Sequence, residues 1–224
     1  DEPKALQVAG KDNLRQQTSM WQAMLIAADL PTTRQVFIHG FIIANGQKMS
    51  KTLGNVVDPI EYVDKYGTDA LRYYLLAKVS PTEDSDFTKE KFEEIYNADL
   101  ANGLGNLVSR VAKLFEINDV YIGKSDSSTF ITGVDESIEN FRFGEALKLI
   151  WDKISYLDKY LNVKKPWGKE KGFHQMVLWG ELTSGLREIA FNLKPFLPKT
   201  SEHIENIFKG PKVDLKDALF PRLK

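Results

Sequence analysis

With 30 lysines and arginines against 31 aspartates and glutamates, the 224-residue chain has a formal net charge of −1. This excludes a uniformly basic nucleic-acid-binding protein and confines any RNA contact to local patches. There is no cysteine and there are only three scattered histidines, which excludes a disulfide framework and a thiolate zinc site, so no metal site is expected. No apolar run approaches the ~18 residues of a membrane span and the first residues do not form a signal peptide, so we expect a soluble, cytoplasmic protein without membrane contact.

The beginning of the chain is predicted to form a strand–helix–strand unit. The short apolar run at residues 5–9 predicts a buried strand. Asp12 or Asn13 is then expected to cap a helix over residues 14–29. Residues 35–39 predict a second strand, and two strands joined by a helix suit a parallel sheet.

A hairpin is predicted next, at Asn45 and Gly46. This dipeptide is the strongest turn signal available, and it joins the apolar residues 41–43 to Gln47 and Lys48. The hairpin therefore leads directly into the basic loop that follows.

Two lysines dominate this loop. Lys48 and Lys51 flank Met49 and Ser50, and a glycine stands on either side of the segment. Lysine ammoniums suit phosphate oxygens, and flanking glycines let the backbone move and approach closely. Such a loop can close on a triphosphate and stabilise the charge that shifts onto a leaving pyrophosphate. The alternative interpretation is a solvated basic turn.

The rest of the chain is predicted to be helical. A polar, acidic connection at residues 80–86 marks the expected domain boundary, which divides the chain into residues 1–85 and residues 86–224. Apolar residues at helical spacing predict that the second part is a helical bundle. Helices are expected at residues 59–67, 70–76, 88–117, 143–161 and 173–192 and after Pro198.

A second candidate motif is Gly-Lys-Asp at residues 10–12. It ends a strand and opens a helix, which is where open α/β sheets bind ligands. Gly10 permits the turn, and Asp12 could accept hydrogen bonds from an ammonium group or a ribose hydroxyl. A simple helix cap is the alternative role for Asp12.

Several motifs resemble a known family. Lys-Met-Ser-Lys-Thr at residues 48–52 resembles the second signature of class I aminoacyl-tRNA synthetases, with threonine in place of the usual fifth-position serine. Gly-Lys-Asp-Asn-Leu-Arg at residues 10–15, followed by Trp-x-Ala-Met-Leu at residues 21–25, resembles the methionyl-tRNA synthetases in particular. Gln-Gln at residues 16–17 departs from that family, which commonly has Phe-His near the methionine side chain.

The resemblance implies roles for residues of the first half. Lys51 would be the main contact to the ATP phosphates, Asp12 would lie at the amino-acid and adenylate pocket, and the backbone near Ile42 would lie beside the adenine. For His39 a partly buried structural role is preferred, because the first class I signature, His-x-Gly-His, is absent from the sequence. The residues implied to bind ATP or the adenylate are Gly10, Asp12, His39, Ile42, Lys48, Met49, Ser50 and Lys51, of which Lys48 and Lys51 are the candidate catalytic residues.

The second half carries a candidate anticodon site. Asn106 and Arg110 lie one turn apart and share a helix face, from which an amide and a guanidinium can read the edges of splayed-out bases. A solvated face or interhelical hydrogen bonds are the alternatives. Trp167 follows Pro166, and the family's Pro-Trp tryptophan stacks on the anticodon. Residues 142–171 carry eight lysines and arginines against four acids, an excess that favours a phosphate backbone.

The resemblance implies a mixed fold: the C-terminal strand–helix–strand portion of a Rossmann-type α/β catalytic domain, followed by an all-α anticodon-binding bundle. The chain is then expected to be part of a methionine–tRNA ligase, with methionine, ATP bound with Mg²⁺, and tRNA-Met bearing the CAU anticodon as substrates. The first signature would lie in a missing N-terminal half of the catalytic domain, so the chain alone is expected to be inactive. The alternatives are a non-catalytic tRNA-binding module, or the corresponding part of a leucyl, isoleucyl, valyl or cysteinyl enzyme.

Overall fold

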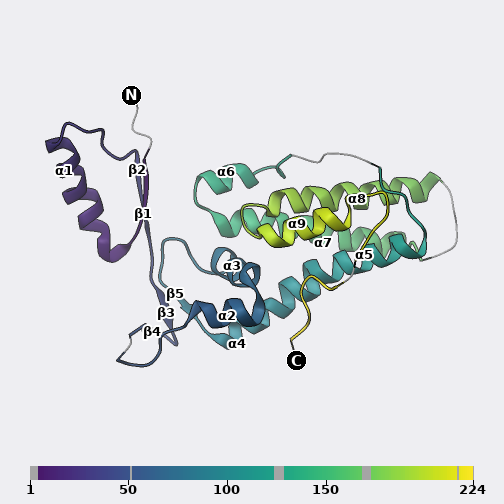
Figure 1. Ribbon diagram of the computed structural model, residues 1–224, viewed down its shortest axis with the longest axis horizontal. Helices are drawn as coiled ribbons and strands as arrows, with labels where there is room; N and C mark the ends of the chain where they lie inside the picture. Colours follow the sequence, from purple (N-terminus) through teal and green to yellow (C-terminus); the bar gives the residue numbers. More distant parts are fainter. Residues whose placement is uncertain (1–4, 51, 124–128, 168–172, 216, 224) are drawn as a thin grey trace. The chain divides into compact units, whose positions relative to one another are not determined.

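The fold was taken from a computed structural model that describes residues 5–50, 52–123, 129–167, 173–215 and 217–223 (Figure 1). The chain folds into two compact units, and each is built from two separate stretches of sequence. The first unit comprises Asp1–Val57 and Val79–Thr88, and the second comprises Asp58–Lys78 and Lys89–Lys224. Among the described residues no helix combines the length and the apolar character needed to cross a membrane.

The first unit begins with the predicted strand–helix–strand arrangement. Strands β1 (Leu6–Gly10) and β2 (Gln35–His39) pair in parallel. Between them lie a short 3-10 turn, a π-helical stretch and helix α1 (Trp21–Ala27). The helix ends two residues before the predicted position, at a turn in which Asp29 has a φ of 56°.

Two expectations about this region are wrong. Gly10 occupies the cap position of the turn after β1 and no side chain caps it, so neither Asp12 nor Asn13 has the expected capping role. The strand is also not buried, because Val8 is 61% exposed. The helix is exposed as well, since Met24 on α1 is also 61% exposed. Two strands and one helix have too little apolar surface to cover one another.

A second small sheet contains the predicted hairpin. Strands β3 (Ile42–Ala44) and β4 (Gln47–Lys48) are antiparallel, and the turn between them has positive φ at Asn45 (52°) and Gly46 (72°), as a type I′ hairpin requires. Strand β5 (Ser85–Phe87) was not predicted; it pairs in parallel with β3. Its first two residues were included in the expected acidic connection, because so short a strand shows no readable alternation.

The second unit starts with two short helices. In α2 (Pro59–Tyr66) the carboxylate of Asp58 caps the helix, because it accepts a hydrogen bond from the backbone N–H of Ile60 at 2.9 Å. Helix α3 (Thr68–Ala77) follows directly. The predicted long helix is continuous and comprises α4 (Lys89–Ile95), a π-helical stretch (Tyr96–Gly105) and α5 (Asn106–Ile117).

The remaining helices complete a bundle, as predicted. They are α7 (Phe143–Lys164), α8 (Phe173–Leu193) and α9 (Pro198–Ile207), together with a short helix, α6 (Val134–Glu139), that was not predicted. Helices α7 and α8 approach closely at Gly185, where an added Cβ would lie 2.8 Å from a methyl carbon of Leu157. The apolar residues predicted to form one stripe of α7 are mostly buried: Phe143 is half-buried, whereas Ala146, Leu147, Ile150, Ile154, Leu157 and Leu161 are buried.

Helix α3 is bound to the end of the bundle by two side chains. The buried carboxylate of Asp69 accepts hydrogen bonds from both the backbone N–H and the hydroxyl of Thr200, each at 2.7 Å. The guanidinium of Arg72 donates to the carbonyl oxygens of Pro195 and Phe196. Packing therefore groups α2 and α3 with the helices of the second unit. The expected boundary between residues 85 and 86, which separates a catalytic part from an anticodon-binding part, remains a prediction.

Candidate functional site

The carboxyl ends of β1 and β2 meet at one edge, because Gly10 pairs with His39 in the parallel register. A Cβ at Gly10 would lie 2.7 Å from an oxygen of the Asp12 carboxylate, so the glycine leaves room for this side chain. The Asp12 carboxylate is exposed, and its hydrogen bond from Asn13 is long, at 3.4 Å. An acceptor is thus presented at the strand ends, where α/β sheets bind ligands.

His39 is exposed, which contradicts the partly buried position expected from the sequence. Its Nδ1 lies 2.8 Å from the carbonyl oxygen of Gly40. Because a carbonyl oxygen only accepts, Nδ1 carries the proton in this contact, and in the neutral ring Nε2 is then an available acceptor. The end of β2 therefore offers a second acceptor beside Asp12.

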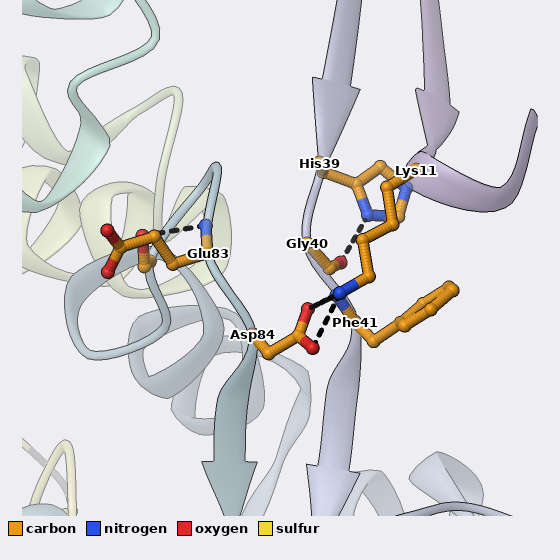
Figure 2. Close-up of polar contacts among 7 residues, drawn as sticks. Lys11, His39, Gly40, Phe41, Glu83 and Asp84 are labelled. Carbon is orange, nitrogen blue, oxygen red and sulfur yellow. Dashed lines mark hydrogen bonds and ion pairs between the residues drawn. The ribbon is translucent and has the colours of Figure 1, made fainter. Parts of the chain in front are cut away.

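An ion pair joins this edge to Asp84, the residue directly before strand β5 (Figure 2). The ammonium of Lys11 donates to both carboxylate oxygens of Asp84 at 2.6 Å, and Asp84 also accepts from the backbone N–H of Phe41 at 2.8 Å. The hydrogen bonds from Lys11 and then from Phe41 lower the pKa of the Asp84 carboxyl. We call this contact the Lys11–Asp84 clasp; sequence reasoning did not find it.

Gly40 makes this approach possible. A Cβ at this position would lie 2.2 Å from the backbone carbonyl group of Glu83, so any other residue would push the two segments apart. Just beyond, the backbone N–H of Ser85 donates to the carbonyl oxygen of Phe41 at 2.9 Å. The backbone around Phe41 is thus held from both sides.

The ring of Phe41 receives two ammonium groups. Lys11 Nζ lies 4.6 Å from the ring centroid and Lys48 Nζ lies 4.5 Å from it. Both distances are within the range of a cation–π interaction. The first lysine of the basic loop and the lysine of the Gly-Lys-Asp turn therefore meet at one aromatic side chain.

The basic loop is closed by Asn55. Its side-chain oxygen accepts from the backbone N–H of Ser50 at 2.8 Å, and its amide nitrogen donates to the carbonyl oxygen of Lys48 at 3.3 Å.

Met49 and Ser50 are half-buried and Lys48 is exposed. The predicted catalytic residue Lys51 lies outside the described residues. Ile42, predicted to lie beside the adenine, begins β3 and is 38% exposed.

The predicted base-reading residues of the helical unit lie on α5, where Arg110 contacts α7. Its guanidinium donates to Asp158 at 2.5 Å and to Asn162 at 2.7 Å, and the Asn162 amide donates to Asp158 at 3.0 Å. We call these three residues the Arg110 network. The structure therefore shows the interhelical hydrogen bonds that the sequence left as an alternative. Asn106 is half-buried one turn before Arg110.

Trp167 follows the end of α7 and is 56% exposed, whereas Pro166 before it is buried. The left-handed backbone of Lys165 (φ 45°) ends the helix. A large indole is thus held at the surface by a buried proline. Two further lysines counted in this region, Lys169 and Lys171, lie outside the described residues.

Two cavities lie elsewhere in the helical unit. One of about 530 Å³ is lined by Trp179 and Arg187 among others, and one of about 300 Å³ is lined by Tyr73 and Asp99. Burial raises the pKa of the Tyr73 hydroxyl, and the neighbouring Asp99 carboxylate raises it further. None of the predicted site residues lines either cavity. Within the described ranges, no three histidine, aspartate or glutamate side chains are grouped as metal ligands.

Comparison with known proteins matches both halves of the chain. A family model described as "tRNA synthetases class I (M)" matches residues 1–112, and one described as "Anticodon-binding domain of tRNA ligase" matches residues 125–222. The methionine–tRNA ligases of Clostridium acetobutylicum and Bacillus subtilis are each 36% identical and match 99% of this chain. The chain spans only 40% and 39% of these two relatives.

Solved structures give the same picture. The methionyl-tRNA synthetase of Mycobacterium tuberculosis in complex with methionyl-adenylate superposes with a TM-score of 0.84 at 27% identity, covering 98% of this chain and 50% of that one. The apo form of the same enzyme gives a TM-score of 0.82 at 25% identity. The likeness extends over both units of the chain.

Proposed function

Because the chain belongs to the class I (M) family of tRNA synthetases, we propose that it is the C-terminal part of a methionine–tRNA ligase. This membership confirms the resemblance inferred from the motifs at residues 10–15 and 48–52. The whole enzyme would join methionine to ATP, release pyrophosphate and transfer the methionyl group from the adenylate to tRNA. This segment would supply the loop that binds the ATP phosphates and the domain that recognises the anticodon.

One observation carries the catalytic part of this proposal. Lys48 of the basic loop and Lys11 of the strand-end turn both lie against Phe41, so the loop is held at the edge where β1 and β2 end. A ligand bound there would meet the Asp12 carboxylate and the lysine loop together. The methionyl-adenylate bound to the Mycobacterium tuberculosis relative supports a ligand of this chemistry.

Each residue then has a definite role. Lys48 and Lys51, with Met49 and Ser50 between them, would bind the phosphates of ATP, which enters with Mg²⁺ as its substrate complex, and would stabilise charge on the leaving pyrophosphate. The Asp12 carboxylate would accept hydrogen bonds from the ammonium of methionine or from a ribose hydroxyl. Gly10 leaves the space for Asp12, while His39 Nε2 and the backbone at Ile42 would border the nucleoside.

The helical unit would bind the anticodon of tRNA-Met. The exposed ring of Trp167 offers a stacking surface for an unpaired base. Arg110 gives one N–H to Asp158 and one to Asn162, and a guanidinium has five N–H donors. The remaining donors, with the amide of Asn106, would read base edges of the CAU sequence.

The test uses an intact enzyme that contains this segment. Lys51→Ala should slow single-turnover adenylate formation on the order of 100-fold, because removing one preorganised donor to developing charge typically loses ~3 kcal/mol of transition-state stabilisation. Methionine affinity should be unchanged, and Lys48→Ala should have a milder effect. Lys113→Ala, an exposed lysine on α5 paired with Glu116, is the matched control. An unchanged single-turnover adenylation rate in Lys51→Ala would instead remove Lys51 from the mechanism.

A further inference from the structure

The two lysines at Phe41 differ in their electrostatic partners. Lys11 has the carboxylate of Asp84 at 2.6 Å, so its charge is compensated. Among the residues the structure describes, no carboxylate lies within ion-pair distance of Lys48, and the aromatic ring at 4.5 Å is its recorded contact. One lysine is therefore neutralised in place, whereas the other is held with its charge uncompensated.

This difference decides what each lysine can do. The negative face of an aromatic ring attracts an ammonium by ~0.5–1 kcal/mol at exposed sites and ~2 kcal/mol when water is excluded, but the ring carries no net charge. An ammonium held in this way keeps its full positive charge for an anion. A carboxylate partner would instead have to be displaced before a phosphate could bind.

The position of Phe41 is fixed by its own backbone. Its N–H donates to Asp84 and its carbonyl oxygen accepts from the N–H of Ser85. The glycine before it allows the segment at Glu83 to cross closely. Asp84 also offsets the repulsion between the ammoniums of Lys11 and Lys48 that share the ring. The ring is therefore a fixed support for a side chain on a loop.

We propose that Phe41 is a positioning residue that holds Lys48 through its aromatic face, ready to bind the phosphates of ATP, and that Lys11 braces the same ring through Asp84 rather than binding phosphate. This inference rests on the proposed function of the lysine loop. It assigns to Phe41 an electrostatic role that a merely space-filling side chain of the same size cannot perform.

The first experiment changes the ring in an intact enzyme containing this segment and follows methionine-dependent ATP–pyrophosphate exchange. Phe41→Leu should lower kcat/KM for ATP by about 2- to 30-fold, the range that corresponds to one cation–π interaction. Phe41→Tyr, which retains an aromatic face, should restore most of the activity. Phe130→Leu, at an aromatic residue of the helical unit that is 45% exposed, is the matched control.

A second experiment separates electrostatics from packing. Phenylalanine carrying one, two or three ring fluorines at position 41 weakens the negative face with little change in shape, so kcat/KM for ATP should fall stepwise with each fluorine. This series also decides the matter if Phe41→Leu fails to fold. In a Lys48→Ala background, the effects of Phe41→Leu and of fluorination should disappear.

The outcomes distinguish this inference from the proposed function. If Lys48→Ala slows the reaction but fluorination of Phe41 has no effect, the positioning role is wrong and the function of the loop stands. The same conclusion follows if Phe41→Leu is equally harmful with and without Lys48. If neither Lys48→Ala nor Lys51→Ala changes adenylate formation, the proposed function fails and the inference fails with it.

Discussion

Replacing Trp167 by alanine should weaken tRNA binding while leaving the protein folded. The indole is 56% exposed, so somewhat less than half of its surface is covered by protein. With ~250 Å² for a tryptophan side chain and ~25 cal/mol per Å², the covered part stabilises the fold by at most about 2.8 kcal/mol. This is an upper bound, because the unfolded chain also covers part of that surface.

The expected loss of tRNA affinity follows from stacking. An aromatic side chain that stacks on an unpaired base contributes ~1–3 kcal/mol, so Trp167→Ala should weaken binding of an RNA with the CAU anticodon by roughly ten- to a hundred-fold. Arg110→Ala should additionally reduce the difference in binding affinity between an RNA with the CAU anticodon and one with a mismatched anticodon, because hydrogen bonds to base edges distinguish the two.

The assay compares two tryptophans of the helical unit. Affinity for a labelled anticodon stem–loop is measured by fluorescence anisotropy at fixed salt, since phosphate contacts make affinity salt-dependent, and stability is measured by urea unfolding. Trp179 is 8% exposed and packs edge-on against Phe115. Trp179→Ala should therefore show the opposite pair of results. The unfolding free energy should fall by about 3–5 kcal/mol, but no stacking contact between the protein and an RNA base is removed.

One result would refute the reasoning for Trp167. If Trp167→Ala destabilised the fold as strongly as Trp179→Ala and left RNA affinity unchanged, Trp167 would belong to the core of the protein and not to the anticodon interface. A similar loss of affinity for every RNA, whether single-stranded or paired, would also contradict stacking on an unpaired base.

Three further predictions concern stability, pH and catalysis. Asp69→Ala should lower the unfolding free energy by about 2–4 kcal/mol in urea titrations, because the two Thr200 donors lose a charged acceptor; an equal loss in Asp69→Asn would contradict the role of the charge. Because Lys11 lowers the pKa of Asp84, the Lys11–Asp84 clasp should be complete above the ordinary aspartate pKa of ~3.9 and lost as the pH falls through the lower folded value. Carboxyl NMR should show the Asp84 pKa returning toward ~3.9 in Lys11→Gln, and an unchanged pKa would exclude the ion pair. The purified 224-residue chain, which spans 40% of the length of the Clostridium acetobutylicum relative, should not catalyse methionine-dependent ATP–pyrophosphate exchange above a Lys51→Ala control, and activity above that control would contradict this expectation.

Local sequence signals predicted local structure well. Asn45 and Gly46 adopt the positive φ values that their turn requires, and the turn depends on these two residues alone. The long apolar stripe of α7 is likewise buried as its periodicity indicates, except at Phe143, which is half-buried at the start of the helix. The family prediction, which rested on short contiguous motifs, is confirmed.

Contacts between distant residues were not predictable in the same way. Lys11 and Asp84 are 73 positions apart, and the sequence around Asp84 reads only as an acidic connection. The shared face of Asn106 and Arg110 follows from helical geometry, but the partner Asp158 lies 48 residues further on. The predicted burial of β1 was wrong because burial depends on what covers a strand and not on its own composition.

The bond between Asp69 and Thr200 has a consequence for synthesis on the ribosome. The two residues are 131 positions apart, and at about 5–20 residues per second the second one is made roughly 7–26 s after the first. During that interval Asp69 has neither of its Thr200 donors, so its carboxylate stays hydrated and α3 cannot complete its packing. A nascent chain that stalls before Thr200 should therefore expose α3, one of the first helices of its unit, to proteases and chaperones.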